Sequence, residues 1–167
     1  MGLFGIPGLD PFGLAHAALG FAALALGLVV IARSKGSAAH RLWGVAYAVA
    51  MVLLNGSALA MYEVTGGPNM LHGFAVISLA TLVAGWVPAL TRRPAGRWYA
   101  RHAVYMAWSY VGLVAAFTAE VAVRLPFGGP GRIFVVAGMS GLVAAVLGTV
   151  LIRRLMPEAV ARAGDAA

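Results

Sequence analysis

Five stretches without a charged residue, each long enough to cross a bilayer, constrain the fold of this chain more than any other feature. A spanning helix needs about 20 apolar residues, because each residue rises about 1.5 Å across a hydrocarbon core about 30 Å thick. We expect such helices at about residues 13–32, 39–62, 70–90, 99–122 and 132–154, joined by short Gly- and Pro-containing connections. The sequence therefore predicts an all-α membrane bundle forming a single transmembrane domain over residues 1–167, with a four-helix core and a fifth helix outside it.

The composition argues against a soluble or disulfide-bonded domain. Hydrophobic residues make up 62% of the chain and charged residues 10%, and the mean hydropathy is +0.90. A soluble domain carries roughly 25% charged residues. The chain has no cysteine, which excludes disulfides, thiolate metal sites and cysteine nucleophiles. Its basic residues lie at the ends of apolar stretches instead of in one patch, so we expect no nucleic-acid partner.

The positions of Lys and Arg predict the orientation of the chain. Ten of the twelve fall on one side of five alternating spans: Arg33, Lys35, Arg41, Arg92, Arg93, Arg97, Arg101, Arg153, Arg154 and Arg162. Only Arg124 and Arg132 fall on the other side. Cytoplasmic loops carry an excess of Lys and Arg. We therefore expect a multi-pass protein of the bacterial inner (plasma) membrane, with the N-terminus outside, the C-terminus in the cytoplasm, and the lipid bilayer as its surroundings.

Four histidines are the main candidates for a functional site. His16, His40, His72 and His102 each lie near the start of a different one of the first four spans. Because successive spans run in opposite directions, His16 and His72 belong at the outer face, and His40 and His102 at the inner face. An ionisable residue inside a membrane is costly and is by default a candidate for function. Two histidines in each leaflet favour a paired role.

Such pairs are suited to two b-type haems, one in each leaflet. Each iron would take one imidazole nitrogen above and one below the macrocycle, and the helices would supply an apolar slot. Arg41 and Arg101 would pair with the propionates of the inner haem. The chain would then carry electrons across the membrane, with a quinone or another small molecule as donor or acceptor. Whether it would itself act as a membrane oxidoreductase stays open.

Two other interpretations remain open. His16, His72 and Glu120 would bind a divalent metal at the outer side, because two imidazoles and a carboxylate suit zinc or iron. Glu120 would otherwise pair with Arg124, four residues further along the same helix face. In the third interpretation the histidines only tie helices together, and the chain is a structural or accessory membrane protein. Glycines in the last span, Gly138, Gly141 and Gly148, predict a helix-packing face or the contact of a homodimer.

Several motifs in the first four spans resemble a known family. The motifs are Lys35-Gly36, His40-Arg41-x-x-Gly44-x-x-Tyr47-x-x-x-Met51, His102-x-x-x-Met106-x-x-Ser109-Tyr110, and Glu120 with Arg124. They are similar to those of the predicted bacterial membrane proteins grouped as domain of unknown function 2306. The resemblance implies a helical membrane protein and adds no mechanism. The layered histidines also resemble those of diheme transmembrane b-type cytochromes, including ascorbate-dependent ferric reductases, which is a likeness of architecture.

Overall fold

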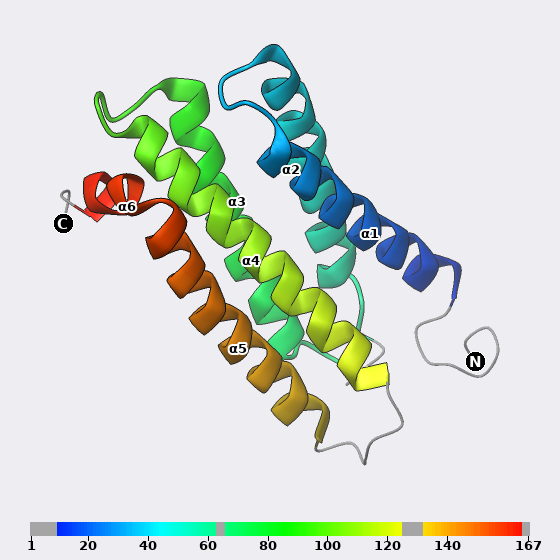
Figure 1. Ribbon diagram of the computed structural model, residues 1–167. Helices are drawn as coiled ribbons and strands as arrows, with labels where there is room; N and C mark the ends of the chain where they lie inside the picture. The colour runs from blue at the N-terminus through cyan, green and yellow to red at the C-terminus, as the bar shows by residue number, and fades with distance from the viewer. Residues whose placement is uncertain (1–9, 63–65, 125–131, 165–167) are drawn as a thin grey trace. The chain divides into compact units, whose positions relative to one another are not determined.

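The structure is a computed structural model that describes residues 10–62, 66–124 and 132–164, and within these ranges it is helical, with no strand. The helices are α1 (Pro11–Ala32), α2 (Ala38–Leu59), α3 (Met70–Thr91), α4 (Trp98–Arg124), α5 (Arg132–Leu155) and α6 (Pro157–Gly164) (Figure 1). Among these described helices, α1 to α5 are long and apolar enough to cross a membrane. The predicted all-α class and the five spans are confirmed.

The chain divides into two compact units, which are residues 1–79 (unit 1) and residues 80–167 (unit 2). The boundary lies inside α3, so the first part of that helix belongs to unit 1 and the remainder to unit 2. Each unit is described by itself below. The single domain with a four-helix core stays a prediction, because it depends on how the units are arranged.

Unit 1 is built around α1 and α2, which lie side by side (Figure 1). The five-residue connection between them makes the two helices antiparallel. Ala23 of α1 and Ala48 of α2 are fully buried, and a Cβ at Gly20 would lie 3.8 Å from Leu54 Cδ1. Small residues of this kind let membrane helices approach closely, where packing rather than hydrophobic burial drives association.

The ends of α1 and α2 are set by polar side chains. The Asp10 carboxylate accepts a backbone N–H of the first turn of α1 at 2.7 Å, and Ser37 Oγ accepts the backbone N–H of His40 at 3.0 Å. These are N-caps, which satisfy donors that have no partner inside the helix. At the other end of α1, Lys35 Nζ donates to the Ile31 carbonyl at 2.6 Å, and partial burial lowers the pKa of Lys35.

Unit 2 is built around α4 and α5, which run side by side, with α6 turning away at the end of α5 (Figure 1). A Cβ at Gly148 would lie 2.5 Å from Val111 Cγ1, so this glycine allows the close contact between α5 and α4. A Cβ at Gly138 would meet nothing within 4 Å. Gly148 therefore serves helix packing within the unit, and the homodimer stays a prediction.

Large apolar side chains cover the outward faces of the helices. More than half of the surface is exposed for Phe21, Leu28, Leu42, Ile77, Leu90, Val135 and Leu142. Soluble monomers rarely expose apolar patches on this scale. All backbone hydrogen bonds of a helix are satisfied within it, so such surfaces are stable against lipid. The exposed faces indicate a chain that lies in a bilayer.

One helix end and one additional helix differ from those expected from hydropathy, and the other helix ends agree to within two residues. The second span ends at Leu59, three residues before the expected end at residue 62. The short helix α6 was not expected, since eight residues are too few to give an apolar stretch. Pro157 stands at its first position, where a missing N–H costs nothing and the fixed φ suits a helix start. The proline therefore separates α6 from α5 and begins a new helix.

Candidate histidine sites

His102 is held in unit 2 by a hydrogen bond to the backbone of α3. It is the fifth residue of α4, and its Nδ1 lies 2.9 Å from the Gly85 carbonyl oxygen. A carbonyl can only accept, so Nδ1 must carry the hydrogen. In a neutral imidazole the lone pair is then on Nε2. This is the hydrogen bond by which metal-binding histidines are usually oriented, with the other ring nitrogen as ligand.

Gly85 makes this bond geometrically accessible. A Cβ at Gly85 would lie 2.9 Å from Met106 Sδ and 3.0 Å from the Met106 backbone nitrogen, both on α4. The helices therefore approach too closely for any larger residue, and the approach brings a backbone carbonyl of α3 within reach of His102. Pro88 lies one turn further along α3 and has no N–H to donate to the carbonyl of the preceding turn. In this part of α3, Gly85 thus allows the close approach to α4, and Pro88 leaves a carbonyl of the preceding turn without its usual backbone donor.

His16 is held in unit 1 by a hydroxyl of α2. Its Nδ1 lies 2.8 Å from Ser57 Oγ, and the Ser57 hydroxyl donates its hydrogen to the Leu54 carbonyl at 2.8 Å. A hydroxyl has only one hydrogen, so Ser57 must accept from His16 Nδ1–H. The lone pair is again on Nε2, as in His102. The contact also places the start of α1 beside the end of α2, as predicted for antiparallel spans.

His72 has the opposite arrangement of hydrogens. Its Nδ1 accepts the backbone N–H of Asn69 at 3.3 Å, so in the neutral ring the hydrogen is on Nε2. Nε2 is buried and has no hydrogen-bond partner among the residues that the structure describes. The ring packs on Tyr62, with centroids 4.9 Å apart and planes 31° apart. Tyr62 and Ser57 both lie near the end of α2, and they contact His72 and His16 respectively. His72 therefore lies at the same end of unit 1 as His16.

His40, Arg41 and Arg101, which were expected around an inner haem, all lie near the start of a helix. His40 is the third residue of α2, and its Nδ1 is buried from solvent. Arg41 is exposed, and its Nη1 donates to the Gly36 carbonyl of the α1–α2 connection at 2.9 Å. Arg101 is partly exposed near the start of α4. His40 belongs to unit 1 and His102 to unit 2, so their pairing stays a prediction.

The metal interpretation gains no support from the described part of the chain. No three His, Asp or Glu side chains among these residues are arranged so that they could hold one metal ion. Glu120 lies on α4 in unit 2, whereas His16 and His72 are in unit 1, so this ligand set also stays a prediction. The side chains of Arg124 and Arg132, named above for the outer side, lie outside the residues whose side chains are described.

Sequence reasoning missed the residues that orient the histidines. His16 is bonded to Ser57, His102 to Gly85 and His72 to Asn69. None of these three partners belongs to a motif that the sequence analysis identified. Ser57 is separated from His16 by 41 positions and Gly85 from His102 by 17. Only Asn69 carried a local signal, since it precedes α3 and its Oδ1 accepts the Leu71 N–H at 2.8 Å as a cap.

The apolar length of α1 to α5 and the polar groups held between helices define a multi-pass helical membrane protein. The chain belongs to a family described as a predicted membrane protein (DUF2306), which it matches over residues 13–157. The resemblance drawn from its motifs is thereby confirmed. Comparisons with curated proteins and with solved structures find no match.

Proposed function

We propose that this chain is a haem-binding electron carrier of the bacterial inner membrane. Its axial ligands would be the Nε2 atoms of His16 and His72 for an outer haem and of His40 and His102 for an inner one. The observation that carries the proposal is the anchoring of Nδ1 in His16 and His102 by Ser57 and Gly85. In both residues the anchor leaves the lone pair on Nε2, the nitrogen that would bind the iron.

Both anchors favour binding of iron by the same nitrogen. The hydrogen bond at Nδ1 fixes the ring orientation and increases the basicity of Nε2, which strengthens a bond to a metal. His16 lies in the second turn of α1 and His102 in the second turn of α4, within the apolar part of each helix. Haem bound there would supply one-electron transfer, and bis-imidazole ligation is one of the protein's means of setting its potential.

In the structure His72 carries its hydrogen on the nitrogen that would bind iron, unlike His16. Binding through Nε2 requires that this nitrogen lose its hydrogen and that Nδ1 take one up. The Asn69 N–H contact at 3.3 Å would then be given up, which is a small loss because that bond is long. Ligation would also satisfy the buried Nε2, which is otherwise costly. Haem binding at the outer site would therefore require one hydrogen to move on His72.

The proposal is tested by the absorption spectrum of protein purified from haem-supplied cells. We expect a red protein whose absorption bands sharpen and shift when dithionite reduces the iron. His102→Ala and His16→Ala should each remove one haem. Ser140→Ala is the matched control, because Ser140 is partly buried on α5 and its hydroxyl donates to the Val136 carbonyl within the same helix.

Three results would contradict the proposal. The first is a colourless wild-type protein with correct helical content. The second is a colourless protein that carries zinc or iron, which would favour the outer metal site with Glu120 instead. The third is a protein whose haem content is the same in all four histidine variants, which would indicate adventitious haem. A quinone as electron partner would be examined only after haem has been found.

A further inference from the structure

One end of unit 2 carries a concentration of arginines. Arg92, Arg93, Arg97, Arg153 and Arg154, here called the arginine cluster, lie where α3 ends, α4 begins and α5 ends. Glu158 is the single acidic residue in the described part of this end. The helix dipole adds a partial positive charge at the N-terminus of α4. The cluster is therefore complementary to an anion.

The connection that carries three of these arginines is ordered by its own contacts. Arg92 has a left-handed backbone (φ 56°), and its guanidinium lies 5.0 Å from the centroid of the Trp98 ring. The Pro94 carbonyl accepts the N–H groups of Arg97 and Trp98 at 3.1 and 3.0 Å. A cation over an indole face is held by the ring quadrupole. Little side-chain freedom is left to lose at Arg92 when an anion binds.

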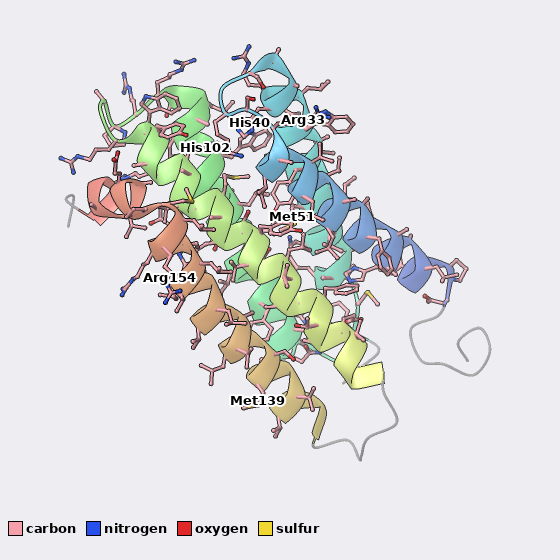
Figure 2. All side chains as sticks on the ribbon, in the orientation of Figure 1. Arg33, His40, Met51, His102, Met139 and Arg154 are labelled. Carbon is pink, nitrogen blue, oxygen red and sulfur yellow. The ribbon has the colours of Figure 1, made fainter. Side chains whose placement is uncertain are left out.

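A cleft of about 390 Å³ opens beside the cluster. Its walls include Tyr99 and Ala103 of α4, Leu155 and Met156 at the end of α5, and Ala159 of α6. The lining is otherwise mainly apolar apart from Glu158, and Arg153 and Arg154 directly precede Leu155 at the end of α5. Arg154 is exposed on α5 near the turn into α6 (Figure 2). An occupant matched to this site has an anionic head and an apolar body.

We propose that this end of unit 2 binds one anionic phospholipid, with its phosphate on the arginine cluster and the glycerol end of its acyl chains in the cleft. Guanidinium groups bind phosphate through paired hydrogen bonds. Basic pockets between membrane helices on the cytoplasmic side are places where anionic headgroups bind. The cleft gives the site a preference for a lipid over a free phosphate, because only a lipid fills the apolar part. The site does not depend on haem.

The test uses the full chain in nanodiscs of equal parts phosphatidylglycerol and phosphatidylcholine, with retained lipids counted by native mass spectrometry. Wild type should retain phosphatidylglycerol in preference to phosphatidylcholine. Arg154→Gln should weaken that retention about fivefold, because it removes a charged hydrogen-bond donor from the phosphate site. Arg33→Gln is the matched control, because Arg33 is an exposed arginine of the α1–α2 connection in unit 1 (Figure 2).

A second pair of variants tests the cleft without a change of charge. Ala159→Phe should lower retention of the lipid by narrowing the cleft, whereas Ala25→Phe, on an exposed position of α1, should not. If Arg154→Gln fails to insert, Arg93→Gln replaces it. The proposal is overturned if wild type retains both lipids equally, or if Arg33→Gln has the same effect as Arg154→Gln. It is also overturned if inorganic phosphate displaces the lipid completely at the concentration at which phosphate alone binds.

Discussion

Replacing Gly85 with alanine should loosen the anchor of His102. The new Cβ would lie 3.0 Å from the Met106 backbone nitrogen and 2.9 Å from its sulfur. The methionine side chain can turn aside, but the backbone nitrogen cannot, so α3 and α4 must separate by a few tenths of an ångström. This separation takes the 2.9 Å bond between His102 and the Gly85 carbonyl to the limit of about 3.2 Å for a good hydrogen bond.

Three terms determine the size of the effect. Overpacking of a close contact costs about 1–3 kcal/mol. A hydrogen bond between membrane helices contributes about 0.6 kcal/mol on average, part of which is lost. Alanine returns up to about 1 kcal/mol because it favours the helix more than glycine does. We expect the free energy of unfolding to fall by about 1–2 kcal/mol from these terms together.

Two measurements check this result. Unfolding in mixed micelles of increasing dodecyl sulfate content, followed by circular dichroism, gives the change in stability. Nitrogen-15 NMR of labelled histidines reports whether His102 Nδ1 still carries its hydrogen. Gly112→Ala is the control on α4, because a Cβ there would meet nothing within 4 Å. Equal stability of the two variants, with an unchanged His102 signal, would refute the role assigned to Gly85.

Further predictions concern the other contacts. Gly148→Ala should destabilise unit 2 by about 1–3 kcal/mol, because its Cβ would overlap Val111; a wild-type unfolding curve would show that α5 tolerates the methyl group. Ser57→Ala should release the Nδ1 hydrogen of His16 to either ring nitrogen, seen as a mixture of tautomers by nitrogen-15 NMR, while Ser57→Thr keeps a single one. Burial lowers the pKa of Lys35 below 10.5, so the unfolded chain binds that proton more tightly and stability rises with pH through the interval between the lowered pKa and 10.5. Lys35→Gln should flatten this rise in alkaline unfolding titrations, and identical slopes would contradict it.

The membrane fold was predictable because hydropathy and helix length depend on local sequence. Apolar stretches of the right length identified five spans, and the structure has α1 to α5 in the corresponding places among the described residues. The positions at which helices end were less predictable. The end of α2 at Leu59 and the separate α6 depend on backbone turns and a proline instead of hydropathy.

The environment of each histidine was not predictable, because its partners come from other helices. His16 and His102 differ in no local feature that would identify Ser57 or Gly85 as partners. The glycine periodicity of the last span was likewise compatible with helix packing within the chain and with a homodimer contact. Gly148 packs on Val111 within its own unit, whereas Gly138 faces no atom within 4 Å, and a periodic pattern alone cannot separate these cases.

The four histidines are equivalent in the sequence, whereas in the structure three of them differ in which ring nitrogen carries the hydrogen. In His16 and His102 a neighbouring oxygen takes the Nδ1 hydrogen, which leaves Nε2 with the lone pair that iron requires. In His72 a backbone N–H donates to Nδ1, and Nε2 keeps its hydrogen in a buried position. If haem is bound as proposed, His72 must move one hydrogen before its Nε2 can bind iron, whereas His16 and His102 need no such change.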